Sequence, residues 1–193
     1  MLEISQNKNK DLILLPHLDD EFALSPLIQI LDKENTRIIF CAERLNEDNI
    51  LLKRRREESL LSTSILGFKK NQVSYLNDFF EVNDCFLFKS SRKIYNHLCH
   101  VLAEEKFSRI FTLAFEGGHP DHDSLALIVD KFCKRENIKN YFFPAYNYNY
   151  FYFIPFTALM PLKSMKYRAK FINIRNYCWA DSLKIALIYK TEK

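Results

Sequence analysis

The chain has 193 residues, of which 48% are hydrophobic, and a formal net charge of +4 at pH 7. This length suits one domain with its own core, so we expect a single domain over residues 1–193. No apolar stretch reaches the roughly 18 residues of a membrane span, and no nucleic-acid-binding motif occurs, which argues against membrane insertion and against a nucleic-acid partner.

The N-terminal segment and the cysteines exclude further classes of protein. Residues 1–10 lack the apolar core and cleavage site of a signal peptide, and we therefore expect a cytoplasmic protein. The five cysteines are odd in number and include no Cys-x-x-Cys pair, which argues against a disulfide framework and against a thiolate zinc site. Most of them are expected to be small core residues.

Short apolar runs alternate with amphipathic segments over most of the chain. The predicted strands are 11–15, 36–42, 73–76 and 109–115, and the predicted helices are 21–33, 49–67, 91–106 and 123–135. Continuous apolar runs are typical of strands that are buried on both faces. The alternation therefore predicts an α/β fold, with a Rossmann-like, mostly parallel sheet covered by helices on both faces.

The composition changes after residue 140. Nine of the fourteen residues in 141–154 are aromatic, which favours strands, and 166–174 and 183–190 are predicted as two more. The domain is thus expected to have a β-rich C-terminal end. Some aromatic side chains here are expected to fill a small β-layer, with stacking on a sugar ring as the alternative. These side chains are Tyr146, Tyr148, Tyr150 and Trp179.

Two polar motifs follow predicted strands directly. The first polar motif, residues 16–21, reads Pro-His-Leu-Asp-Asp-Glu, and the second polar motif, residues 117–123, reads Gly-Gly-His-Pro-Asp-His-Asp. Ligands of open α/β sheets collect at the carboxyl ends of the strands, so we expect both motifs at one edge of the sheet. Two of the three glycines in the chain are Gly117 and Gly118, which predicts a tight loop that presents the following side chains.

Three side chains of these motifs are of the residue types that form a catalytic zinc site. Such sites use three ligands from His, Asp, Glu and Cys, with the fourth position left to water. His17 can end a strand while Asp20 begins a helix, so that both converge on one ion, and His122 can supply the third ligand. We therefore predict a zinc site, with another divalent metal as the alternative.

The other polar side chains of the motifs are assigned catalytic roles. Asp19 cannot easily point to the same place as its neighbour Asp20, so it is free to act as general base on a water whose pKa the ion lowers. His119 is left to stabilise the oxyanion of a tetrahedral intermediate or to protonate a leaving amine. Asp121 is expected to orient His119 and to hold it in the charged, protonated form. Helix capping alone is the alternative for the acidic residues of the first motif.

The paired motifs Pro-His-x-Asp-Asp-Glu and Gly-Gly-His-Pro-Asp-His resemble those of the PIG-L family, the LmbE-like zinc de-N-acetylases. The resemblance covers roughly residues 10–137. It implies a hydrolase that removes an N-acetyl group from a small-molecule amino sugar or an N-acetylglucosaminyl conjugate. It also implies the same metal ligands, general base and oxyanion-stabilising histidine that the residues themselves indicate.

One weaker similarity to the family and two differences from the family's sequence pattern concern the substrate. Arg55-x-x-Glu58 is similar to a helix that lies near the sugar site in the family, which implies a substrate contact for Arg55, with a solvated helix face as the alternative. Leu18 stands where the family usually has proline, and residues 77–81 lack the family's Asp-Gly. The sequence therefore leaves the identity of the sugar open.

Other functions are compatible with the same residues. The predicted ligands could serve the hydrolysis of another amide or of a phosphoester. A non-catalytic carbohydrate-binding protein on the same fold is an alternative of a different class. Contact with a membrane surface through the basic run at residues 53–56 is a third, although no strongly amphipathic helix supports it.

Overall fold

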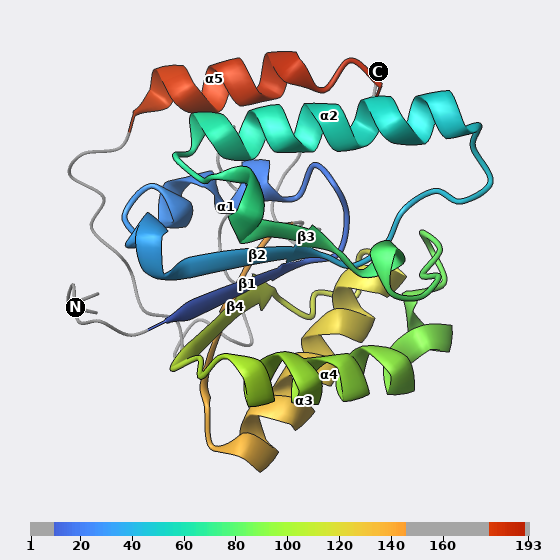
Figure 1. The fold of residues 1–193 in the computed structure, drawn as a ribbon, viewed down its shortest axis with the longest axis vertical. Helices are drawn as coiled ribbons and strands as arrows, with labels where there is room; N and C mark the ends of the chain where they lie inside the picture. Colours follow the sequence, from blue (N-terminus) through green and yellow to red (C-terminus); the bar gives the residue numbers. More distant parts are fainter. Residues whose placement is uncertain (1–9, 146–177, 192–193) are drawn as a thin grey trace.

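A five-stranded parallel sheet forms the centre of the computed structural model, which describes residues 10–145 and 178–191 (Figure 1). The strands are β1 (Asp11–Leu15), β2 (Thr36–Phe40), β3 (Val73–Tyr75), β4 (Arg109–Leu113) and β5 (Lys139–Phe143). Their order in the sheet is β3-β2-β1-β4-β5, and every pair is parallel. The direction of winding therefore reverses between β1 and β4, and this is the point where open sheets bind ligands.

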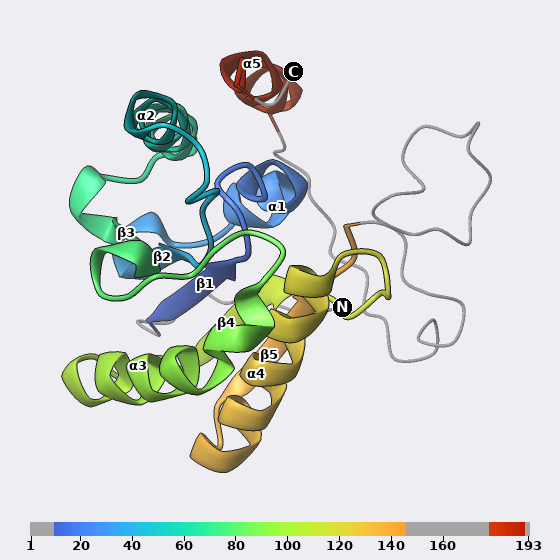
Figure 2. The ribbon, with the colours of Figure 1, turned by 90° about the vertical axis from the view of Figure 1, so that its right-hand side faces the viewer.

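Helices cover both faces of the sheet (Figure 2). The helices are α1 (Glu21–Ile28), α2 (Asn49–Ile65), α3 (Ser91–Glu104), α4 (Pro120–Glu136) and α5 (Trp179–Ile188). In Figure 2, α1, α2 and α5 lie on one side of the sheet, and α3 and α4 lie on the other. The predicted α/β fold with a parallel sheet between two helical layers is confirmed. Among the described residues, no helix has both the length and the apolar character that crossing a bilayer requires.

The central strand β1 shows why two helical layers are needed. All five of its residues are buried, and successive side chains of a strand point to opposite faces. Leu12 and Leu14 pack in the core that includes residues of α3 and α4, whereas Ile13 and Leu15 pack in the core that includes residues of α1 and α5. A strand that is apolar on both faces requires cover on both, and the alternating helices supply it.

The prediction of a strand at residues 183–190 is wrong, because this segment lies in helix α5 and its C-terminal end. Ser182, Ile185 and Tyr189 are buried while Leu183 and Leu187 are exposed, and spacings of three and four are those of a helix face. A short apolar run fits both periods, and packing of α5 against α1 and α2 decides for the helix.

Of the remaining predictions for the C-terminal third, one falls on described residues. The strand predicted for residues 166–174 and the side chains of Tyr146, Tyr148 and Tyr150 lie outside the described residues. Trp179 begins α5 and is 64% exposed. The expectation that Trp179 fills a β-layer is therefore wrong.

The end of α5 is bonded to the first polar motif. The hydroxyl of Tyr189 donates to the carbonyl oxygen of Leu18 at 2.5 Å and also forms a hydrogen bond with Glu21. The hydroxyl of Ser62 in α2 donates to the same carboxyl group of Glu21. Glu21 is fully buried, and burial raises its pKa to about 8, so its carboxyl group is protonated at neutral pH. The C-terminal helix thus holds the chain segment that runs from His17 to Glu21.

We predict that Tyr189→Phe lowers the free energy of unfolding by about 1–3 kcal/mol, because buried acceptors lose their donor. Urea denaturation measures the change. Tyr95→Phe is the matched control, because the hydroxyl of Tyr95 meets Arg135 at an exposed site and its loss is expected to cost less than about 0.5 kcal/mol. Equal costs for the two variants would contradict the role given to Tyr189.

Candidate metal centre

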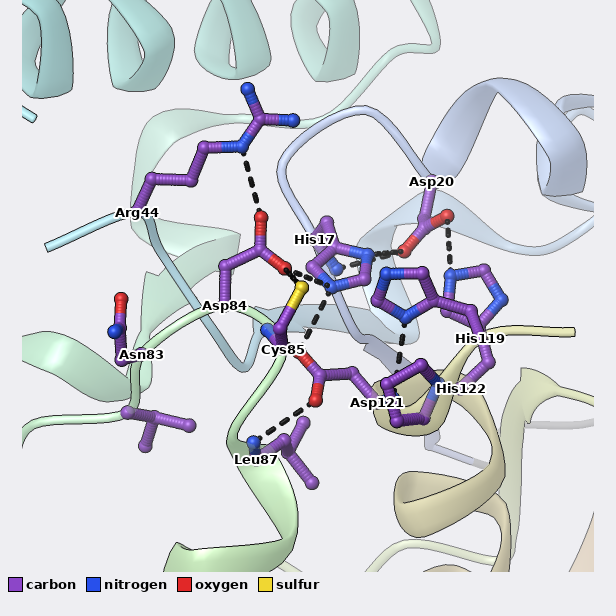
Figure 3. Close-up of polar contacts among 12 residues, drawn as sticks. His17, Asp20, Arg44, Asn83, Asp84, Cys85, Leu87, His119, Asp121 and His122 are labelled. Carbon is purple, nitrogen blue, oxygen red and sulfur yellow. Dashed lines mark hydrogen bonds and ion pairs between the residues drawn. The ribbon is translucent and has the colours of Figure 1, made fainter. Parts of the chain in front are cut away.

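The structure brings the three histidines of the two polar motifs together at the switch between β1 and β4 (Figure 3). His17 follows β1, His119 immediately precedes α4, and His122 lies in the first turn of that helix. The ring centroids are 4.7 Å apart for His17 and His119, 5.3 Å for His17 and His122, and 5.0 Å for His119 and His122. We call these three residues the histidine cluster.

The carboxylate of Asp20 lies between two of these rings. Its Oδ2 is 3.2 Å from Nδ1 of His17, and its Oδ1 is 3.4 Å from Nε2 of His122. Ligands of a tetrahedral zinc ion, at 2.0–2.2 Å from the metal, are about 3.4 Å from one another. The distances from Asp20 to His17 and to His122 are close to this value, and each involves a different oxygen of the Asp20 carboxylate. One donor atom of His119 lies within 4.8 Å of donors of His17 and His122, so a set of three imidazoles is also within reach.

The second nitrogen of His17 faces two more carboxylates. Nε2 is 3.1 Å from Oδ2 of Asp121 and 3.2 Å from Oδ1 of Asp84. Asp121 is held in place because it also accepts hydrogen bonds from the backbone N–H groups of Cys85 and Leu87, at 2.7 Å and 3.0 Å. A histidine that binds a metal commonly donates its other N–H group to a carboxylate in this way.

This placement of Asp121 differs from the expectation that its carboxylate orients His119. The carboxylate contacts His17, and only the backbone N–H of Asp121 reaches His119, donating to Nδ1 at 3.3 Å. The reason is the geometry of α4, whose first turn points the side chain of Asp121 back toward β1. His119 is thereby left with Nδ1 as an acceptor, so its neutral form carries the proton on Nε2.

The charges of the site favour a cation. Burial alone would lower the pKa of His17, but hydrogen bonds to Asp121, Asp20 and Asp84 raise that pKa well above its usual value. The hydrogen bond with His17 in turn lowers the pKa of Asp84. Three carboxylates that converge on one imidazole form an excess of negative charge, which a divalent ion neutralises better than a single proton does.

The lowered pKa of His119 contradicts the expectation that Asp121 holds this histidine protonated, whereas His122 and Asp19 suit the roles predicted for them. Burial lowers the pKa of both His119 and His122, so both rings are neutral at neutral pH, and a neutral imidazole is the form that binds metal. Asp19 is half-buried, and burial followed by the charge of Asp20 raises its pKa, which makes its carboxylate a stronger proton acceptor.

The loop of the second polar motif is tight, as its glycines predict. Gly117 has a φ of 73°, in the left-handed region that favours glycine. Asp123 closes the loop by accepting hydrogen bonds from the backbone N–H groups of Glu116 and Gly117, at 2.8 Å and 3.1 Å. Pro120 follows as the first residue of α4, which therefore begins three residues before the helix predicted at 123.

Two residues at the site, Asp84 and Arg44, were not among the predicted site residues. Residue 83 forms a parallel bridge with Glu43, and this pairing carries the following segment across the edge of the sheet to His17. Nε of Arg44 contacts Oδ2 of Asp84 at 2.9 Å. The only sequence signal was a carboxylate after the third strand, and the long connection hides its relation to the sheet edge.

The side chain of Arg55 is buried in the structure. It is only 5% exposed, so the expectation of a solvated helix face is wrong. Its guanidinium lies 2.7 Å from a carboxylate oxygen of Glu47 and donates to the backbone carbonyl of Thr191 at 3.2 Å. Glu58, one turn later, accepts from the backbone N–H of Lys190. This pair holds the segment after α5, and a substrate contact for Arg55 stays a prediction.

Three solved structures show the breadth of this fold. N,N'-diacetylchitobiose deacetylase from Pyrococcus horikoshii is 23% identical, with a TM-score of 0.50 over 65% of this chain and 49% of that one. A deacetylase from the biosynthesis pathway of teicoplanin, in complex with teicoplanin, is 10% identical, with a TM-score of 0.65 over 95% and 88%. GalB, the 4-carboxy-2-hydroxymuconate hydratase from Pseudomonas putida KT2440, is 13% identical, with a TM-score of 0.58 over 94% and 79%.

These similarities show a shared fold, and the chain spans about half the length of the diacetylchitobiose deacetylase, 49% of it. No curated protein sequence matches the chain significantly. The family model for PIG-L, described as GlcNAc-PI de-N-acetylase, matches residues 12–133. The matched residues include both polar motifs. This match covers more than half of the chain and agrees with the resemblance of the motifs. The protein therefore belongs to the PIG-L family.

Proposed function

We propose that this protein is a zinc-dependent hydrolase that removes an N-acetyl group from an amino sugar or an N-acetylglucosaminyl conjugate. The observation that carries the proposal is the convergence of His17 and His122 on the carboxylate of Asp20, with the ring of His119 next to that of His17 and the charges of Asp20 and His17 acting on Asp19. Membership of the PIG-L family supports it, as do the deacetylases among the structures with this fold.

The ligands are proposed to act as a pre-formed set. A zinc ion bound by His17, Asp20 and His122 would polarise the amide carbonyl and lower the pKa of the attacking water. Asp20 is restrained because one of its oxygens accepts from the backbone N–H of His17 at 2.8 Å. Asp121 fixes the orientation of the His17 ring through Nε2. Little rearrangement is then needed when the site is filled.

Two side chains move or stabilise charge in the proposed reaction. Asp19 accepts a proton from the attacking water, and its raised pKa suits this task. His119 receives a hydrogen bond at Nδ1 and so presents an N–H at Nε2, which can donate to the oxyanion of the tetrahedral intermediate. Breakdown of this intermediate gives acetate and a free amine, with the amine taking up the proton.

We predict that Asp19→Asn lowers kcat by about 10²–10⁴-fold, because the amide cannot accept the proton of the attacking water. Release of acetate from a panel that includes N-acetylglucosamine and N,N'-diacetylchitobiose measures the effect, with phosphate release from phosphoesters assayed in parallel. Asp130→Asn is the control, since Asp130 pairs with Lys134 on the surface of α4. Full activity of Asp19→Asn would refute the mechanism, and sugar binding without turnover in the unchanged protein would favour the non-catalytic alternative.

Removal of the metal is expected to abolish acetate release. A chelator strips the protein, one equivalent of zinc is returned, and the rate is compared with that after one equivalent of iron or manganese. Metal analysis of the purified protein shows which ion it carries. Activity that survives complete removal of metal would exclude a metal-dependent reaction.

A second metal experiment tests the carboxylate behind His17. We predict that Asp121→Asn weakens zinc binding by about 10–100-fold, because the carboxylate that orients the ligating ring loses its charge. Competition with a chromogenic chelator measures the affinity, and Asp130→Asn again serves as control. An unchanged zinc affinity would show that Asp121 does not support the ligand.

A further inference from the structure

Arg56 in α2 binds two acidic residues that follow neighbouring strands. Its Nε donates to Oε1 of Glu43 at 2.6 Å, and its Nη2 donates to Oε2 of the same carboxylate at 2.7 Å. Its Nη1 donates to Oδ1 of Asp78 at 2.6 Å. Glu43 follows β2, and Asp78 follows β3. One guanidinium group therefore joins two strand ends at the carboxyl edge of the sheet, where the histidine cluster also lies.

The pairing of Arg56 with Glu43 is a strong restraint. The side chain of Glu43 is only 5% exposed, and the guanidinium engages both of its carboxylate oxygens. A bidentate pair fixes the orientation of both partners, and a buried carboxylate that loses its partner is strongly destabilised. The ring of Tyr75 in β3 supports the same guanidinium, with Cζ of Arg56 at 4.5 Å from the ring centroid.

The backbone of Glu43 holds the segment that carries Asp84. The N–H of Glu43 donates to the carbonyl oxygen of Val82 at 3.1 Å, and its carbonyl oxygen accepts from the N–H of Asp84 at 2.9 Å. These two bonds lie on either side of residue 83, where the parallel bridge forms. We call residues 82–85 the Asp84 segment. Its place at the edge of the sheet follows the place of Glu43.

The Asp84 segment supplies two contacts behind His17. Oδ1 of Asp84 lies 3.2 Å from Nε2 of His17, and Figure 3 shows this carboxylate directed at the ring. The next N–H group, that of Cys85, donates to Asp121 at 2.7 Å, and Asp121 is the second carboxylate on the same nitrogen. A shift of the Asp84 segment would therefore disturb both carboxylates that orient His17.

We propose that Arg56 is a positioning residue of the metal centre, which acts by fixing Glu43 and thereby the Asp84 segment. Its contact with Asp78 adds a second point of attachment, on the connection that leads from β3 to this segment. The expected effect on zinc rests on the proposed function, because it requires His17 to be a ligand. The effect on the place of the Asp84 segment does not.

Zinc affinity tests the effect on the metal centre. Arg56→Gln is expected to weaken zinc binding by about 10-fold, measured by competition with a chromogenic chelator, because the carboxylates behind a ligating histidine are displaced. Arg37→Gln is the matched control, since Arg37 also joins a carboxylate, that of Glu105, to a second segment, but near the start of β2. It is expected to leave zinc affinity unchanged, and an equal loss in both variants would overturn the proposal.

A double-mutant cycle tests whether Arg56 acts through Asp84. Asp84→Asn alone is expected to weaken zinc binding. In the Asp84→Asn background, Arg56→Gln is expected to cause a smaller further loss than it does in the unchanged protein, because two residues that act through one contact are not additive. An equal loss in both backgrounds would overturn the proposal, since Arg56 would then act independently of Asp84.

Hydrogen exchange of the metal-free protein tests the place of the segment without zinc. The N–H groups of Asp84 and Cys85 are expected to exchange about 10-fold faster in Arg56→Gln, and at the unchanged rate in Arg37→Gln. Unchanged exchange in Arg56→Gln would overturn the proposal. Arg56→Lys, which keeps the charge but cannot bind both oxygens of Glu43, is used if the glutamine variant does not fold. Failure of the unchanged protein to bind zinc would count against the proposed function, and the exchange rates would still decide the role of Arg56.

Discussion

The site depends on the restraint of one imidazole ring by carboxylates on both of its nitrogens. Asp20 lies 3.2 Å from Nδ1 of His17, and Asp121 lies 3.1 Å from Nε2. These carboxylates come from opposite ends of the family match, and they meet only because β1 and β4 are neighbours in the parallel sheet. The register Asp11 to Arg109 between these strands therefore determines where the two polar motifs face each other.

The ion pair that joins these strands lies at the end of the sheet away from the site. Arg109 binds Asp11 through both carboxylate oxygens, at 2.7 Å and 2.6 Å. At the other end Asp20, Asp84 and Asp121 all converge on His17, and Arg44 pairs with Asp84. Negative charge is thus concentrated where a cation could bind. The backbone N–H groups in the first turn of α4 stabilise this negative charge.

The fold alone does not decide the reaction. Structures with this architecture include deacetylases and, in GalB, a hydratase, so the chemistry has to be argued from the side chains. In this chain the side chains concerned are the proposed metal ligands, Asp19 and His119, whose neutral ring carries its proton on Nε2. The C-terminal helix adds a feature outside the family match, because Tyr189 binds the backbone of the first motif and Arg55 and Glu58 hold the segment that follows.

The sequence by itself determined the layered α/β fold and the ligand-type residues, because apolar runs and motifs are local patterns that report burial and chemistry directly. Contacts between distant segments were decided by the tertiary structure. Asp121 turns to His17, 104 residues away, and Asp84 arrives on a connection with no periodic signal. The run at 183–190 fits a strand or a helix equally well, and only packing against α1 and α2 selects the helix. Partners of this kind depend on strand order and register, which no local pattern encodes.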